Sequence, residues 1–165
     1  MSMLRRYKSD CNLYFITNVT YNRLPILVEH GDLLMTSMES IGNKEDVIII
    51  AYTILPEHLH LIMDVNDFNI STIMQRIKMS FGALYRGRMR ANSGRIWQHR
   101  FWDHIIRSQE DFNRHLDYIH YNPVKHGYAK SPFEWEYSSI HDYLDYYPED
   151  WGRKEKIGFE GNFGE

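Results

Sequence analysis

A predicted β-hairpin at residues 46–65 constrains the fold more strongly than any other segment. Residues 46–54, with the sequence DVIIIAYTI, are mostly apolar and rich in β-branched side chains, which predicts a central strand. The short turn LPE follows, and residues 58–65 return as a second strand beside the first. An apolar strand pair must be covered by other elements, so we expect the rest of the chain to supply helices and flanking strands.

The segments on either side of the hairpin supply those elements. Residues 12–20 and 99–107 combine β-branched and aromatic side chains and predict two more strands. Helices are predicted at residues 30–42, 69–86, 108–122 and 138–147. The order strand, helix, strand, strand, helix, strand is typical of a ferredoxin-like α+β domain, an antiparallel sheet with helices packed on one face.

Capping residues indicate where two of these helices begin and end. Asn69 or Ser71 has a side-chain oxygen that can cap the start of the second helix. Ser108 opens the third helix in the manner of a capping box. The residue before a proline disfavours the helical conformation, so Pro123 should stop this helix near Asn122.

The composition is that of an ordinary globular domain. The 165 residues, 43% of them hydrophobic and 25% charged, are enough for one domain with its own core. We expect that domain at residues 1–147, followed by a disordered acidic and glycine-containing tail at residues 148–165. A single cysteine rules out a disulfide framework or a cysteine-rich zinc site. The sequence predicts no membrane span and no secretory signal, and therefore a cytoplasmic protein.

The distribution of charge points to nucleic acid, although the net charge of -3 does not. No acidic residue lies between Asp67 and Asp103, whereas this stretch contains seven cations: Arg76, Lys78, Arg86, Arg88, Arg90, Arg95 and Arg100. Such a segment can form a positive surface that binds DNA phosphates, and arginine suits bidentate phosphate contact. Trp97 could stack on an unpaired base, with core packing as the alternative. A solvated helix face is the plainer interpretation of the cations.

The histidines of the sequence His58-Leu59-His60 lie two residues apart in the second strand of the hairpin. Because side chains alternate along a strand, both imidazoles point to one face, with Cα atoms about 6.6 Å apart. Both rings can then bind one metal ion, and imidazole ligands favour Mn²⁺ over Mg²⁺. Two histidines on a strand face are also common by chance, so a metal site needs a further element.

That element could be the helix at residues 108–122. Tyr118 and Asn122 are four residues apart and are therefore neighbours on one helix face, at the sheet edge or in solvent. If the helix packs beside the histidine strand, the Asn122 amide oxygen could complete the metal ligands, with Tyr118 facing the same point. The alternative is an amphipathic helix with a tyrosine at its rim and Asn122 as its C-cap.

Three segments, in the same order along the chain, resemble one protein family. They are residues 55–61 (LPEHLHL), 96–104 (IWQHRFWDH) and 117–127 (DYIHYNPVKHG). In these segments the chain resembles the REP-associated tyrosine transposases, relatives of the small single-tyrosine HUH transposases of bacterial insertion sequences. The resemblance implies a ferredoxin-like HUH fold, a divalent metal ion (Mg²⁺ or Mn²⁺), and cleavage and rejoining of single-stranded DNA at palindromic repeats that fold into hairpins.

The resemblance also implies roles for single residues. His58 and His60 match the family's metal-binding histidine pair, and Tyr118 matches the nucleophile that forms a 5′-phosphotyrosine. Asn122 stands where insertion-sequence relatives carry a longer, metal-ligating glutamine. Insertion-sequence relatives act as dimers and REP-associated ones as monomers, so the resemblance favours a monomer for this chain. Helix geometry, and not the resemblance, suggests an acceptor for the Tyr118 proton. The candidates are His115 and His120, and His115 is preferred because it lies one helical turn earlier on a similar face.

The residues alone leave other functions open. A non-catalytic module on the same fold would bind hairpin nucleic acid through the cations and would need neither metal nor Tyr118. A small metallo-phosphoesterase would use His58 and His60 with no covalent step. The acidic tail could lie over the positive site and compete with DNA, although a solvated tail is the simpler expectation.

Overall fold

The computed structural model describes residues 7, 12–153 and 155–165 of the chain. Four strands form one sheet: β1 (Leu13–Val19), β2 (Ile48–Ile54), β3 (His58–Asp64) and β4 (Trp102–Ile105). Three α-helices accompany it: α1 (Gly31–Glu45), α2 (Ile70–Met89) and α3 (Gln109–Lys125). The described 3-10 helices are η1 (Tyr21–Arg23), η2 (Pro132–Glu134) and η3 (Ser139–Asp142). None of the helices in these ranges is long and apolar enough to span a membrane.

The sheet confirms the predicted ferredoxin-like α+β fold. Its strands are antiparallel and lie in the order β2-β3-β1-β4. β3 pairs with both β1 and β2, and all seven of its residues are buried. Thr17 of β1 lies opposite His60, and Val19 lies opposite His58. The histidine pair therefore belongs to a central strand, whereas β4 forms one edge of the sheet.

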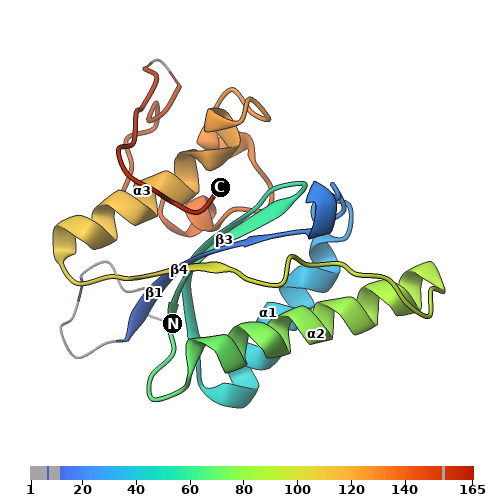
Figure 1. Cartoon of the computed structure of the whole chain (residues 1–165). Helices are drawn as coiled ribbons and strands as arrows, with labels where there is room; N and C mark the ends of the chain where they lie inside the picture. The colour runs from blue at the N-terminus through green and yellow to red at the C-terminus, as the bar shows by residue number, and fades with distance from the viewer. Residues whose placement is uncertain (1–6, 8–11, 154) are drawn as a thin grey trace.

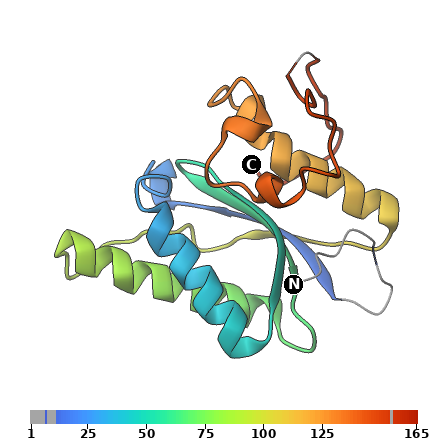
Figure 2. The ribbon, with the colours of Figure 1, turned by 180° about the vertical axis from the view of Figure 1, so that it is seen from behind.

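Helices cover both faces of the sheet, with α1 and α2 on one face and α3 on the other (Figure 1, Figure 2). On the first face, Leu59, Leu61 and Met63 of β3 share a core with α1 and α2. On the second face, Ile62 of β3 packs with α3. The expectation that the helices pack on one face was wrong in this respect. Apolar side chains at consecutive positions of β3 point to both faces, so both must be covered.

The predicted capping residues begin α2 and α3. Asn69 Oδ1 accepts a hydrogen bond from the backbone N–H of Ser71 at 2.8 Å. Ser108 Oγ accepts one from the backbone N–H of Asp111 at 3.0 Å. Both contacts satisfy donors that a helix N-terminus otherwise leaves unpaired, which explains why the helices begin at these residues.

The C-terminal end of α3 differs from the prediction. The helix passes through Pro123 and ends at Lys125 rather than near Asn122. A proline this close to the helix end removes one helical hydrogen bond, while the backbone N–H of His126 still donates to Asn122 O at 3.0 Å. The three added residues place Lys125 in the helix, where its position matters for the site. The helix predicted at residues 138–147 is reduced to the single 3-10 turn η3.

Residues 148–153 and 155–165 pack on the domain instead of forming the expected disordered tail. Phe163 is 6% exposed and joins the core of α3, and Phe159 packs against the same core. Figure 1 shows the segment in red beside α3. The acidic composition suggested a solvated tail, but its aromatic side chains supply the apolar area that keeps it on the domain.

Candidate active site

β3 and α3 bring the predicted histidines, tyrosine and asparagine to one place. His58 and His60 are 1% and 0% exposed, and their ring centroids are 4.9 Å apart. Tyr118 of α3 lies against His60, with ring centroids 5.3 Å apart. Asn122, one turn further along α3, has its Oδ1 3.3 Å from His58 Nε2. Side chains from distant parts of the sequence therefore share one buried site.

Hydrogen bonds determine which imidazole nitrogens face this site. The Thr17 hydroxyl donates to Phe163 O at 2.5 Å, so it can only accept from His60 Nδ1–H at 2.8 Å. His58 Nδ1–H donates to the Glu57 carboxylate at 3.1 Å. Burial lowers the pKa of His60 to about 4, which keeps that ring neutral near pH 7. With Nδ1 as the donor in each ring, Nε2 of His60 and Nε2 of His58 face the site as the remaining ring nitrogens.

Glu165 completes the group of possible metal ligands. Its Oε1 lies 2.8 Å from His60 Nε2 and 3.5 Å from His58 Nε2. Asn122 Nδ2 donates to the same Oε1 at 2.7 Å, so the other end of the amide, Oδ1, faces His58. Two nitrogen lone pairs and two oxygens thus converge, and a divalent cation fits such a set of mutually repelling acceptors. We name His58, His60, Asn122 and Glu165 the histidine cluster.

The Tyr118 hydroxyl lies beside a lysine. Lys125 Nζ donates to Tyr118 Oη at 2.9 Å and lies 4.9 Å from the centre of the ring. The same ammonium is 2.5 Å from Glu165 Oε2. Burial, followed by the hydrogen bond and the charge of Glu165, raises the pKa of Tyr118 above its usual range. Glu165 therefore favours the protonated phenol, whereas the charge of Lys125 favours the phenolate.

The C-terminal segment covers Tyr118. Phe163 stacks flat on the tyrosine ring, with centroids 3.8 Å apart and an interplanar angle of 8°. Phe159 meets the same ring edge-on at 5.3 Å. Tyr118 and Asn122, expected at the sheet edge or in solvent, are consequently 1% and 0% exposed. Phe163 and Phe159 therefore shield the Tyr118 ring from solvent.

The other histidines of α3 have different partners. His115 Nδ1 donates to Asp111 O at 2.8 Å, and its ring stacks on His104 at 4.6 Å. His120 is hydrogen-bonded at both ring nitrogens to other side chains. The contacts of His115 with Asp111 and His104 therefore replace the contact with the Tyr118 hydroxyl that the sequence analysis expected. His104, Asp111 and His115 also form a second group that could hold a metal ion.

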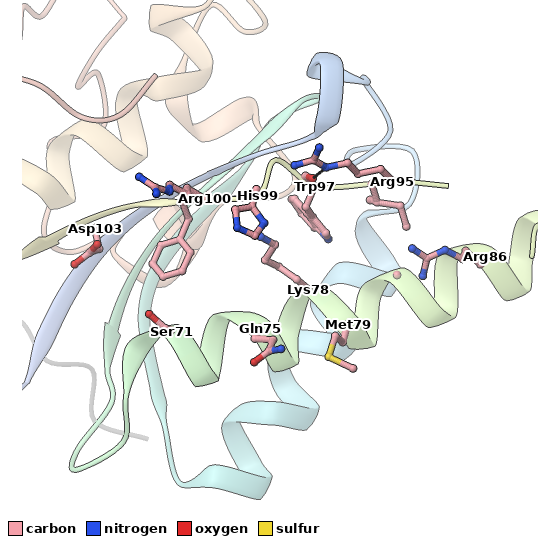
Figure 3. Close-up of a pocket in the computed structure, with 13 residues that line it drawn as sticks. Ser71, Gln75, Lys78, Met79, Arg86, Arg95, Trp97, His99, Arg100 and Asp103 are labelled. Atoms are coloured by element: carbon pink, nitrogen blue, oxygen red, sulfur yellow. Dashed lines mark hydrogen bonds between the residues drawn. The ribbon is translucent and has the colours of Figure 1, made fainter. Parts of the chain in front are cut away.

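The seven cations of the acid-free stretch do not form the single surface expected from the sequence. Arg76 forms an ion pair with Glu45, and Arg88 forms two hydrogen bonds with Asp32, both partners being on α1. Arg90 is the C-cap of α2. The remaining cations line a pocket of about 650 Å³ between α2 and residues 95–103, together with Trp97 (Figure 3). They are Lys78, Arg86, Arg95 and Arg100.

Lys125 and Glu165 are site residues that the sequence analysis did not find. Lys125 lies seven residues after Tyr118, and two helical turns place both on one face, so the spacing held a usable signal. The helix end expected at Asn122 concealed it. Glu165 is 105 residues from His60, and its place in the histidine cluster comes from the fold alone.

Known proteins resemble this chain over most of its length. The family described as "Transposase IS200 like" matches residues 7–122. The REP-associated tyrosine transposase of Escherichia coli (strain K12) is 33% identical over 156 residues, which cover 92% of this chain and 91% of that protein. A Haemophilus influenzae protein named for the same group is 34% identical over 175 residues, covering 98% and 99%. A solved REP-associated tyrosine transposase bound to a REP hairpin is 31% identical with a TM-score of 0.82, and the match covers 100% of this chain and 98% of that one.

Proposed function

The chain belongs to the REP-associated tyrosine transposases within the IS200-like family, and we propose that it cleaves and rejoins single-stranded DNA at palindromic repeats through a phosphotyrosine on Tyr118. The observation that carries this proposal is the meeting of Tyr118 with the paired imidazoles of His58 and His60 in one buried site. The REP hairpin bound to the relative of known structure supports hairpin DNA as the substrate.

Tyr118 supplies the nucleophile in this reaction. Its Oη forms a bond to phosphorus, the bond from phosphorus to the 3′ oxygen breaks, and the phenolic proton ends on that 3′ oxygen. The 5′-phosphotyrosine keeps the energy of the phosphodiester, so a second 3′-OH can displace Tyr118 without a nucleotide cofactor. Lys125 Nζ, hydrogen-bonded to Oη, stabilises the negative charge that develops there.

His58, His60 and Asn122 are the residues that would hold a divalent metal ion. When bound, Mg²⁺ or Mn²⁺ would neutralise the non-bridging oxygens of the scissile phosphate. Thr17 and Glu57 orient the two imidazoles for this role by accepting their Nδ1–H groups. Nitrogen ligands favour Mn²⁺ over Mg²⁺.

The C-terminal segment occupies the space that the DNA needs. The Glu165 carboxylate accepts hydrogen bonds from Asn122 Nδ2 and Lys125 Nζ, two donors that also suit a phosphate oxygen. Phe163 covers the face of Tyr118. We therefore infer that DNA and this segment compete for the histidine cluster, whereas the sequence analysis considered competition at the positive surface.

Glu165→Ala is accordingly expected to raise the initial rate of hairpin cleavage roughly 10-fold or more, because a charge-assisted hydrogen bond no longer has to be displaced. The rate is measured with labelled hairpin DNA below saturation and a fixed Mn²⁺ concentration. Glu160→Ala is the matched control, since it removes an exposed carboxylate from the same segment outside the histidine cluster. A slower reaction together with weaker Mn²⁺ binding in Glu165→Ala would instead make Glu165 a required ligand.

A denaturing gel tests the proposed reaction itself. With labelled hairpin DNA and Mn²⁺, the protein should give a slowly migrating, protease-sensitive band, and chelation of the metal by EDTA should remove that band. DNA binding without cleavage would favour the non-catalytic module. Cleavage with no covalent band would favour a metallo-phosphoesterase.

One chain contains every group that this reaction uses. Tyr118 and His60 are in contact within the same chain, which supports a monomer as the active form. We place its action in the bacterial cytoplasm, where the DNA substrate lies.

A further inference from the structure

A second group of metal-binding side chains lies where the edge strand β4 meets the start of α3 (Figure 1). It consists of His104 on β4 and of Asp111 and His115 in the first two turns of α3, and their donor atoms all lie within 4.8 Å of one another. We name these three residues the second cluster. The proposed cleavage reaction uses none of them, so their arrangement needs its own explanation.

The carboxylate of Asp111 lies between the two imidazoles. His104 Nε2 is 2.8 Å from Asp111 Oδ2, and His115 Nδ1 is 3.1 Å from Asp111 Oδ1. The two rings stack nearly parallel, with centroids 4.6 Å apart and an interplanar angle of 16°. Two imidazole nitrogens and one carboxylate therefore meet at one place, and Zn²⁺ takes this donor set at sites that keep a fourth position for water.

The backbone aims all three side chains at this place. His104 lies opposite Phe15 in the pairing of β4 with β1, so its side chain points to the face of the sheet that α3 covers. Asp111 and His115 are four residues apart on α3 and share one helix face. The Ser108 cap fixes the start of the helix. Little rearrangement is therefore needed to bring the three donors onto one ion.

Hydrogen bonds hold the same groups together in the structure. His104 Nε2–H donates to the Asp111 carboxylate, and His115 Nδ1–H donates to Asp111 O at 2.8 Å. A neutral imidazole can move its proton to the other ring nitrogen, which frees the first one as a metal ligand. Burial lowers the pKa of His115, so that ring is neutral near pH 7.

The second cluster is open to solvent on one side. The side chains of His104 and Asp111 are 37% and 16% exposed, whereas that of His115 is 2% exposed. An ion can therefore enter from the side of His104. The ring of Phe15 lies between the second cluster and the histidine cluster, with its centroid 4.7 Å from that of His115 and 5.5 Å from that of His60. The two clusters are therefore separate sites.

Arg114 is a cation that an incoming ion would meet. Its Nη2 lies 3.6 Å from Asp111 Oδ1, and its Nη1 donates to Glu160 O at 3.2 Å. The side chain is 46% exposed and can turn into solvent. The backbone N–H of Arg107 also donates to Asp111 Oδ2, at 3.3 Å, and this neutral contact can remain when the carboxylate binds a metal ion.

We propose that His104, Asp111 and His115 bind one Zn²⁺ ion, with water in the fourth position, and that this ion fastens β4 to α3. β4 has four residues, pairs with β1 and forms an edge of the sheet. A cross-link to α3 would therefore hold a short strand that has few other attachments. The ion differs from the one that the histidine cluster would hold, so this inference goes beyond the proposed function.

The first experiment counts the Zn²⁺ ions that the full chain binds. Equilibrium dialysis at neutral pH, followed by elemental analysis, should find one Zn²⁺ fewer per chain in His104→Ala than in the unaltered protein. The loss of affinity should exceed the roughly 10- to 100-fold that removal of an outer partner of a metal ligand costs. His99→Ala is the matched control, since it removes an exposed histidine outside the cluster. Equal Zn²⁺ content in His104→Ala and the unaltered protein would overturn the proposal.

Asp111→Asn separates metal binding from folding. Its amide oxygen can still accept the hydrogen bond from His104 Nε2–H, so the variant should keep the circular dichroism spectrum of the folded protein. The amide lacks the negative charge of the carboxylate, so the same Zn²⁺ ion should be lost. A folded Asp111→Asn with the full Zn²⁺ content would also refute the site.

Imidazole ¹⁵N resonances locate the ion. The His104 signals, identified by their absence in His104→Ala, should shift when Zn²⁺ is added and should not move with the same concentration of Mg²⁺, which prefers oxygen ligands. No shift at saturating Zn²⁺, or an equal shift with Mg²⁺, would contradict the assignment. The covalent band of the cleavage test does not depend on this result, so the two proposals can fail separately.

Amide hydrogen exchange tests the cross-link. Zn²⁺ should slow exchange of the β4 amides in the unaltered protein by roughly 10-fold, because local opening of the strand must then break a metal–ligand bond. His104→Ala keeps the histidine cluster but should show no such protection. Equal protection in both proteins, or none in the unaltered one, would show that the ion does not fasten β4.

Discussion

Tyr118→Phe is expected to abolish hairpin cleavage, with a rate at least roughly 10³-fold lower and no covalent protein–DNA band. Phenylalanine keeps the ring that packs against His60 and Phe163 but lacks the oxygen that would bond to phosphorus. The Lys125 ammonium group, which lies next to the missing oxygen, cannot replace it as the nucleophile. The denaturing gel measures both the rate and the covalent band.

The same variant should still fold and bind hairpin DNA. It loses the hydrogen bonds of Tyr118 Oη with Lys125 and Glu165, so the free energy of unfolding should fall by about 2 kcal/mol. Tyr121→Phe is the matched control, because it removes a hydroxyl from the same helix that contacts the backbone of Ile157 and not the histidine cluster. Cleavage that survives Tyr118→Phe would refute the nucleophile assignment.

His60→Ala should lower metal-dependent cleavage by roughly 10²- to 10³-fold while leaving hairpin affinity nearly intact. The reason is that His60 Nε2 offers its lone pair within the buried cluster and makes no contribution to the basic pocket. Titration with Mn²⁺ should show weakened metal binding, and a filter-binding assay should show retained DNA binding. Cleavage and DNA binding that fall in proportion would contradict this division of roles.

A second variant separates metal binding from folding, because His60→Ala also removes a ring that stacks on Phe15 at 5.5 Å. Thr17→Val keeps His60 but removes the acceptor that orients its Nδ1–H. We expect a loss of roughly 10- to 100-fold in Mn²⁺ affinity or activity, as for other residues that orient a metal ligand. His141→Ala, an exposed histidine bonded to Trp135 O, should leave both quantities unchanged.

Most of the fold could be predicted because its signals are local. The apolar run of β2, the turn before His58 and the capping side chains of Asn69 and Ser108 each act within a few residues, and the structure contains all of them. The placement of α3 on the second face of the sheet was missed. It depends on which apolar side chains of β3 remain uncovered once α1 and α2 have packed, and this is a property of the whole sheet.

The candidate site divides in the same way. His58 and His60 share a face because a strand alternates, and Tyr118 and Asn122 share a face because a helix turns every 3.6 residues. The pairing of Arg88 with Asp32, in contrast, requires α1 and α2 to lie side by side. A count of cations along the chain therefore overstated the DNA-binding surface.

The sequence by itself determined the order of strands and helices, the residues that present two imidazoles on one face, and the family that the chain resembles. Each of these follows from backbone geometry over short spans or from motifs that can be read in place. Only the tertiary structure decided that Phe163 covers Tyr118 and that Glu165 enters the histidine cluster. Those facts depend on which distant surfaces pack together, and no local periodicity encodes that choice.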